Sequence, residues 1–231
     1  KVQNNLENIK KFLIKQGFKT IIQRLENNSF INKNLNISSK KESEVKTKYI
    51  TVIKKEELKK ILDQISKEGL CAIDTETDSL NIEQAKLVGI SICYNEHSSY
   101  YIPINHKNVT NNKISNGQIA EKDVLDIIKT ICSDSSILKI GQNIKYDIRI
   151  LSKYGIKFES IEDTMLMSYA LDNGLTRHSM DDLAFFHLNH STIKFKELVG
   201  SGKKQITFDY VNIKEATSYA AEDALITLRL Y

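Results

Sequence analysis

From Tyr49 onward, short apolar runs alternate with longer amphipathic segments, a pattern that predicts strands and helices in one α/β domain. Helical spacing of apolar residues covers residues 56–67 and 121–132. The strand candidates are YITVI (49–53), LCAID (70–74), KLVGISICY (86–94), SYYIPI (99–104) and ILKIG (137–141). Three of these runs follow one another closely, which favours an antiparallel start. Helices dominate after residue 141, so we expect a mixed central sheet flanked by helices.

The two ends of the chain differ from this pattern. Residues 7–26 predict two short amphipathic helices broken at Gly17, and residues 27–48 have the Asn-, Ser- and Lys-rich composition of a flexible linker. Residues 211–231 have helical periodicity but reach Tyr231 without a helix stop signal. We therefore expect one main domain over residues 49–231 in a chain cut from something longer.

Charge is distributed unevenly along the 231 residues. Residues 1–60 contain 15 Lys+Arg and 6 Asp+Glu, a net charge of +9. Residues 61–231 contain 18 Lys+Arg and 23 Asp+Glu, a net charge of −5, so the whole chain carries +4. The main domain is thus mildly acidic, and nucleic-acid binding cannot be inferred from a global basic field.

The number of cysteines and the length of the apolar runs indicate the cellular compartment. Cys71, Cys93 and Cys132 are odd in number and far apart, so we interpret them as core residues in a reducing compartment. No apolar run approaches the roughly 18 to 20 residues that cross a membrane. We expect a cytoplasmic protein without a membrane segment, and a monomer.

The first candidate site is the pair Asp74 and Glu76, which directly follows the apolar run LCAI. Alternate side chains of a strand share one face, so both carboxylates point the same way and can grip a divalent cation. Asp-x-Glu is common by chance, and an acidic turn after a strand is the alternative interpretation.

Two further acids lie on the apolar faces of predicted helices. Asp147 shares a face with Ile144, Ile148 and Leu151. Asp223 lies in a stripe formed by Ala216, Tyr219, Ala220, Ile226, Thr227 and Leu230. A helix-boundary Asp or buried ion pair would explain Asp147 equally well, and a Tyr–Asp core pair would explain Asp223.

Together the four acids predict a metal site. Burying an ionised carboxylate is costly, and four clustered carboxylates cannot all stay ionised without cations. Oxygen ligands favour hard ions, so Mg²⁺ is the expected occupant, with Mn²⁺ as a substitute. Tyr219 lies one helical turn before Asp223 and points its hydroxyl to the same place.

In this arrangement the sequence resembles the tyrosine subclass of the DEDD exonuclease superfamily, and closely the 3′→5′ proofreading domain of bacterial family A DNA polymerases I. The matching segments are DTETDSL (74–80), KLVGISICY (86–94) with YIPINH (101–106), KIGQNIKYDIRIL (139–151), DTMLMSYAL (163–171), RHSMDDLA (177–184), GKKQITF (202–208) and YAAEDALITL (219–228). Residues 12–25 also resemble the end of the neighbouring 5′→3′ nuclease region, so residues 1–26 would be a short helical segment from that region. The resemblance implies a ribonuclease H-like, DnaQ-like exonuclease fold and a polymerase domain in cis.

The resemblance also implies residue roles. Asp74, Glu76 and Asp223 would hold one metal ion, Asp74 and Asp147 a second, and Tyr219 would orient the attacking water. The substrate would be a single-stranded or frayed DNA 3′ end, and the product a nucleoside 5′-monophosphate. The implied substrate contacts are Leu80, Asn143, Tyr146, Arg177 and Phe208.

Two other functions remain open at this point. A catalytically silent DNA-binding scaffold could keep the same fold, although none of the four acids nor Tyr219 is missing. An RNA-trimming exonuclease of the same superfamily would share the motifs. For Leu80 and Phe208, a place in the hydrophobic core is the alternative to substrate contact.

Overall fold

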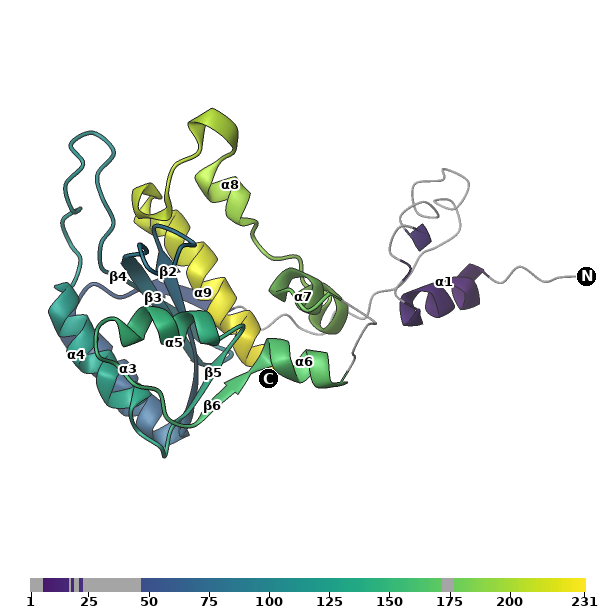
Figure 1. The fold of residues 1–231 in the computed structure, drawn as a ribbon. Coiled ribbons are helices and arrows are strands. Elements are labelled where there is room, and N and C mark those ends of the chain that lie inside the picture. Colours follow the sequence, from purple (N-terminus) through teal and green to yellow (C-terminus); the bar gives the residue numbers. More distant parts are fainter. Residues whose placement is uncertain (1–5, 17, 19–20, 23–46, 172–176) are drawn as a thin grey trace, which may run out of the picture.

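A six-stranded mixed sheet forms the centre of the protein, which we describe from a computed structural model (Figure 1). The structure describes residues 6–16, 18, 21–22, 47–171 and 177–231. The strand order is β1-β4-β3-β2-β5-β6. The strands are β1 (Lys48–Thr51), β2 (Leu70–Thr77), β3 (Leu87–Asn95), β4 (Ser98–Pro103), β5 (Leu138–Gly141) and β6 (Ile161–Asp163).

The directions of the strands confirm the predicted antiparallel start. β2 pairs with β3, and β3 with β4, in antiparallel register, whereas β1 joins β4, β5 joins β2 and β6 joins β5 in parallel. The sequence pattern missed β6. Its three residues are too few for an alternating pattern, and neighbouring β5 defines it through pairing.

Helices lie on both faces of the sheet. The helices are α1 (Leu6–Lys15), α3 (Lys55–Glu68), α4 (Glu121–Cys132), α5 (Lys145–Ser152), α6 (Thr164–Leu171), α7 (Met180–Leu188), α8 (Phe195–Val199) and α9 (Ile213–Leu230), with single 3₁₀ turns at Gly202–Lys204 and Phe208–Tyr210. Both periodic segments predicted as helices, residues 56–67 and 121–132, are confirmed as α3 and α4.

Alternation along β2 divides its side chains between two cores. Cys71 and Ile73 join the large cluster that includes Leu58 of α3 and Val124 of α4. Ala72 faces the opposite way and joins Ala224 and Leu225 of α9. Residues 74 and 76 continue the Ala72 series, so the strand turns both carboxylates toward α9.

Small residues let α9 lie close to the sheet. Its buried face carries Ala216, Ala220 and Ala224, and the helix packs against β1, β2, β3 and β4. The helix begins after Asn212, whose side chain accepts a hydrogen bond from the Lys214 backbone N–H. This cap matches the preference for Asn at helix starts.

The remaining sequence expectations concern the cysteines, a membrane span and the N-terminal segment. All three cysteines are buried and free, as predicted. Among the described residues, no helix is long and apolar enough to span a bilayer. The first N-terminal helix is confirmed as α1. Most of the second predicted helix and most of the 27–48 linker lie outside the described residues.

Candidate active site

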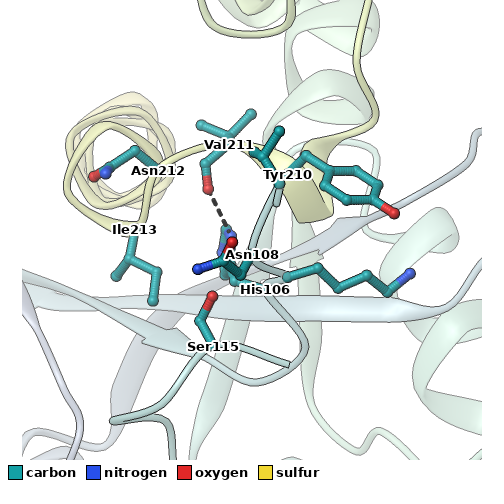
Figure 2. A pocket seen from close by; sticks show the side chains of 9 residues that line it. His106, Asn108, Ser115, Tyr210, Val211, Asn212 and Ile213 are labelled. Carbon is teal, nitrogen blue, oxygen red and sulfur yellow. Dashed lines mark hydrogen bonds between the residues drawn. The ribbon is translucent and has the colours of Figure 1, made fainter. Parts of the chain in front are cut away.

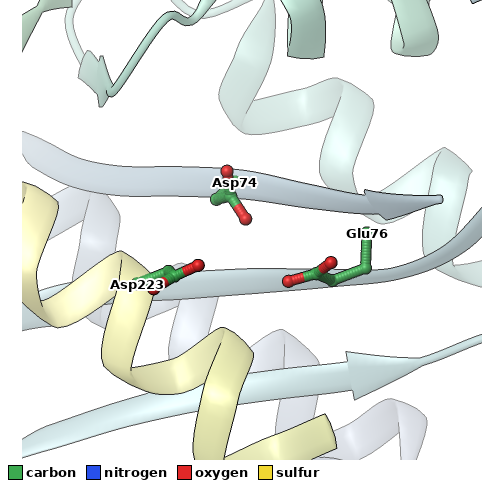
Figure 3. A group of neighbouring side chains, drawn as sticks. All are labelled: Asp74, Glu76 and Asp223. Atoms are coloured by element: carbon green, nitrogen blue, oxygen red, sulfur yellow. The ribbon is translucent and has the colours of Figure 1, made fainter. Parts of the chain in front are cut away.

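Three carboxylates from two elements meet on the α9 face of the sheet. Asp74 and Glu76 extend from β2, and Asp223 extends from α9 toward them (Figure 3). One oxygen of each lies within 4.8 Å of the other two. Residues almost 150 positions apart in sequence thereby form one acidic cluster, as the resemblance implied.

Burial governs the protonation of this cluster. Glu76 and Asp223 are buried, and Asp74 is partly buried. Burial, followed by the negative charges of neighbouring acids, raises the pKa of Asp74 and of Glu76 well above the usual range. Burial also raises the pKa of Asp223 to about 8, although a hydrogen bond from Tyr219 opposes the shift.

Asp147 lies beside the cluster but has partners of its own. Its Oδ1 accepts hydrogen bonds from the Thr75 backbone N–H at 2.8 Å and the Thr75 hydroxyl at 2.6 Å. Burial raises the pKa of Asp147 to about 7, although the two Thr75 hydrogen bonds lower it. The Asp147 charge in turn raises the pKa of Asp74 and of Glu76, so the four acids interact electrostatically.

One oxygen of the cluster has no partner. Glu76 Oε1 is buried and accepts no hydrogen bond from the described residues. A buried carboxylate oxygen without a donor is destabilising unless a cation satisfies it. The all-oxygen donor set and this unsatisfied atom fit a hard divalent cation.

A glycine brings a tyrosine beneath the cluster. Gly89 of β3 pairs with Glu76, and the Tyr101 hydroxyl lies 2.1 Å from where a Gly89 Cβ would stand. A side chain at position 89 would therefore displace Tyr101. Burial, followed by the charges of Glu76 and Asp74, raises the pKa of Tyr101.

Tyr219 stands one turn before Asp223 and is half-buried. Burial, and next the Asp223 charge, raise its pKa far above the usual range. The phenol therefore stays protonated at neutral pH and acts as a hydrogen-bond donor, not as a general base.

The remaining predicted contact residues occupy different environments. Leu80 follows β2 and is 91% exposed. Tyr146 is half-buried; its hydroxyl donates to the Ser79 carbonyl and lies 2.6 Å from Thr77 Oγ1. Asn143 adopts a left-handed backbone at φ 61°, and its N–H donates to Asp163. Arg177 is exposed directly after residues 172–176, which lie outside the described part.

The position of Phe208 favours a place in the hydrophobic core, the alternative to the predicted base contact. Its side chain is 1% exposed and packs in the core with Val88, Tyr101 and Val211, so neither ring face is available to a base. The neighbouring side chain of Phe195 is 42% exposed. Phe195 stacks on Phe208 and lies 6.0 Å from the Tyr219 ring, between centroids.

Sequence reasoning missed Phe195 for a clear reason. Residues 193–198 read IKFKEL, in which a single aromatic flanked by lysines resembles a surface helix start. The charged flanks were the available indication that this ring, and not that of Phe208, remains exposed.

A separate cavity of about 330 Å³ lies beside the start of α9 (Figure 2). It is lined by His106, Lys107, Asn108, Val109, Ser115, Tyr210, Val211, Asn212 and Ile213. None of the predicted site residues lines this cavity, so the acidic cluster remains the candidate active site.

Known proteins with related sequences carry the same domain. A family model described as 3′-5′ exonuclease of the DNA polymerase A type matches residues 49–231. DNA polymerase I of Rhizobium leguminosarum is 44% identical over 176 residues, which cover 71% of this chain and 17% of that protein. DNA polymerase I of Pseudomonas aeruginosa is 42% identical over 173 residues, covering 74% and 18% respectively. The chain therefore spans less than a fifth of the length of these relatives.

Solved structures support the fold. Brucella melitensis NrnC bound to pGG aligns with a TM-score of 0.53 at 23% identity, covering 70% of this chain and 69% of that chain. Escherichia coli RNase D aligns with a TM-score of 0.57 at 15% identity, covering 80% and 43%. At these identities the likeness concerns the mixed sheet and its flanking helices, which are those of ribonuclease H-like exonucleases.

Proposed function

Because this chain belongs to the 3′-5′ exonuclease family of DNA polymerase A type, we propose that it removes nucleoside 5′-monophosphates from single-stranded or frayed DNA 3′ ends. The observation that carries the proposal is the convergence of Asp74, Glu76 and Asp223 within 4.8 Å. The presence of Asp147 and Tyr219 beside them supports catalysis over a silent scaffold.

The four acids would bind two divalent cations. Asp74, Glu76 and Asp223 would hold one, and Asp74 with Asp147 the other, with Mg²⁺ or Mn²⁺ suited to oxygen ligands. When bound, such a pair lowers the pKa of the attacking water and stabilises charge on the leaving 3′ oxygen. Glu76 Oε1, which lacks a hydrogen-bond donor, supports this assignment.

Protein groups would position the reactants. The protonated Tyr219 hydroxyl and the Glu76 carboxylate would orient the water for in-line attack on phosphorus. The water gives up a proton to solvent as the new P–O bond forms and the bond to the 3′ oxygen breaks, and that oxygen takes up a proton from solvent to leave as a hydroxyl. The products are a nucleoside 5′-monophosphate and a strand shortened by one nucleotide.

Sequence-independent contacts would hold the strand. Leu80, at 91% exposure, is available to wedge against a terminal base, and Phe195 offers the ring face that buried Phe208 does not. Stacking tolerates any base because each has a π-face. Asn143, Tyr146 and Arg177 would contact the terminal nucleotide or its phosphate.

Proofreading follows from this binding mode. A mismatched terminus unpairs more easily than a matched one, so it reaches a single-strand site more often. Since the related sequences belong to DNA polymerases I, we infer a polymerase domain in cis. We also propose that the protein acts as a monomer in the cytoplasm. The 42–44% identity to these relatives favours DNA over RNA as substrate.

A direct assay tests the proposal. With Mg²⁺ or Mn²⁺, the purified protein should shorten 5′-labelled single-stranded DNA stepwise from its 3′ end, and an RNA of equal sequence more slowly. Asp74→Ala and Asp223→Ala should lower the rate at least about 1,000-fold, as loss of a metal ligand removes the activated water. Asp63→Ala, at an exposed position of α3, is the matched control. A wild-type protein that binds metal but releases no mononucleotide would contradict the proposal.

A further inference from the structure

The connection between α7 and α8, residues 189–194, is fastened to α9 directly beside the acidic cluster. Glu222, which is 5% exposed, accepts hydrogen bonds from His190 Nε2 at 2.8 Å and from the Ile193 backbone N–H at 2.6 Å. Glu222 immediately precedes Asp223, so these bonds fix the connection next to a cluster carboxylate.

Lys194 is the basic residue at the end of this connection. Its Nζ lies 2.8 Å from Asp181 Oδ2 and donates to Thr192 Oγ1 at 3.0 Å, while the Thr192 hydroxyl donates to Asp181. The Lys194 and Asp181 side chains are 45% and 52% exposed. An exposed ion pair adds little stability, so Lys194 can exchange Asp181 for another anion at low cost.

The bond from the Ile193 backbone N–H to Glu222 holds the next residue, Lys194, beside the turn of α9 that carries Asp223. A phosphodiester strand that approaches four carboxylates meets like charge, and a cation beside the cluster offsets this repulsion.

The next residue along the chain is Phe195, whose exposed ring lies 6.0 Å from the Tyr219 ring. A cation and a stacking surface are therefore adjacent in sequence and beside the same helix. A nucleotide strand carries a phosphate next to each base, so this arrangement matches the repeat of a single strand.

We propose that Lys194 binds a backbone phosphate of the single strand, next to the base on which Phe195 would stack under the proposed function, with Asp181 holding the lysine in place until the strand arrives. The inference rests on the proposed exonuclease function, because it assigns a strand-binding residue to that same site. Asp181 and Glu222 act as positioning residues, since they hold the connection and do not touch the strand.

Salt dependence separates a phosphate contact from a structural role. Binding of a labelled oligothymidylate should be followed by anisotropy, with Ca²⁺ replacing Mg²⁺ to slow hydrolysis, between about 50 and 200 mM KCl. Each phosphate contact with a single strand adds about 0.7 to the slope of log affinity against log salt. Lys194→Gln should make that slope about 0.7 shallower, and Lys194→Arg should keep it. With Mg²⁺, Lys194→Gln should raise KM severalfold at low salt and leave kcat within about twofold. The reason is that the lost contact binds the strand equally well before and during the reaction.

The control is Lys122→Gln, because Lys122 is exposed on α4, which packs in the core on the other face of the sheet. This variant should bind with the wild-type slope. A Lys194→Gln variant that keeps the wild-type slope overturns the proposal even if its affinity falls, because the loss is then structural. Absence of mononucleotide release by wild-type protein counts against the exonuclease function alone, since the binding slopes still test the Lys194 contact.

Discussion

Glu76 illustrates how a residue proposed to hold a metal ion lowers the stability of the metal-free protein. Its Oε1 is buried without a donor, and its carboxyl lies among acids that share no basic partner inside the cluster. Such a group is destabilising in isolation and becomes favourable only when a cation is bound. Under the proposed function, the bound cation would offset this cost to stability.

Two phenylalanines that stack on each other should respond differently to truncation. Phe208→Ala should lower the free energy of unfolding by about 3–5 kcal/mol, because a fully buried ring is lost. Phe195→Ala should cost about 1 kcal/mol or less, because that ring is 42% exposed, but should raise KM about fivefold or more through lost stacking.

Urea unfolding and steady-state hydrolysis of single-stranded DNA measure these two effects. If Phe208→Ala does not fold, Phe208→Leu provides a milder truncation with the same direction. Equal stability losses in both alanine variants would show that the two rings do not divide their roles.

At the scale of elements, β2 and α9 meet through like charges. Alanines of α9 and alternate residues of β2 bury apolar area between them, yet Asp74, Glu76 and Asp223 stand at the same contact. Apolar packing must therefore offset the repulsion when no cation is present. The docking of α9 is the element-level property that the proposed metal binding would strengthen.

Removal of one charge from this contact should stabilise the metal-free protein. The folded pKa of Asp223 is raised above its unfolded value, so the folded state binds more protons and stability falls as pH rises from about 4 to about 8. Asp223→Asn should raise the free energy of unfolding at pH 8 in EDTA by about 1–3 kcal/mol, since one pKa unit corresponds to about 1.4 kcal/mol.

Thermal and urea unfolding of both proteins, with EDTA and with Mg²⁺, provide the measurement. The wild type should gain stability from Mg²⁺, and the variant should gain much less. A variant less stable than the wild type in EDTA would mean that Asp223 is satisfied by protein groups alone.

At the scale of the whole molecule, a buried histidine joins distant segments. His106 follows β4 and is 1% exposed; its Nδ1 lies 3.0 Å from the carbonyl of Val211, just before α9 (Figure 2). A carbonyl only accepts, so Nδ1 carries the proton and Nε2 accepts from the Tyr101 hydroxyl at 2.7 Å. The neutral ring thus connects the sheet beneath Glu76 to the start of the helix that carries Asp223.

Acid should weaken this connection. Burial lowers the pKa of His106 from 6.5 to about 4, so the unfolded state binds the proton more tightly. The neutral His106 ring contributes up to about 3 kcal/mol to the free energy of unfolding. This contribution is complete above about pH 6.5 and is lost as pH falls toward 4. His106→Asn should be less stable than wild type at pH 7 but should lose less stability between pH 6.5 and 4.5.

Urea unfolding at several pH values checks this difference in slope. Tyr101→Phe serves as the comparison, because it removes the hydroxyl and leaves the titrating ring. Parallel loss of stability in wild type and His106→Asn would show that the ring does not titrate in this range.

Local periodicity by itself determined much of this protein. The two-residue repeat of β2 set Asp74 and Glu76 on one face, and the helical repeat of α9 turned Asp223 and Tyr219 inward. Backbone geometry imposes these repeats on neighbouring residues, so they can be deduced from sequence alone. The order of the motifs identified the family, and the family implied the fold.

Only the tertiary structure decided which distant groups meet. Burial of Phe208 and exposure of Phe195, the Thr75 bonds to Asp147, and the Glu222 bonds to residues 190 and 193 all join separate segments. The three-residue strand β6 likewise exists through its pairing with β5. No repeat within one segment encodes such contacts, because they depend on the packing of elements far apart in the chain.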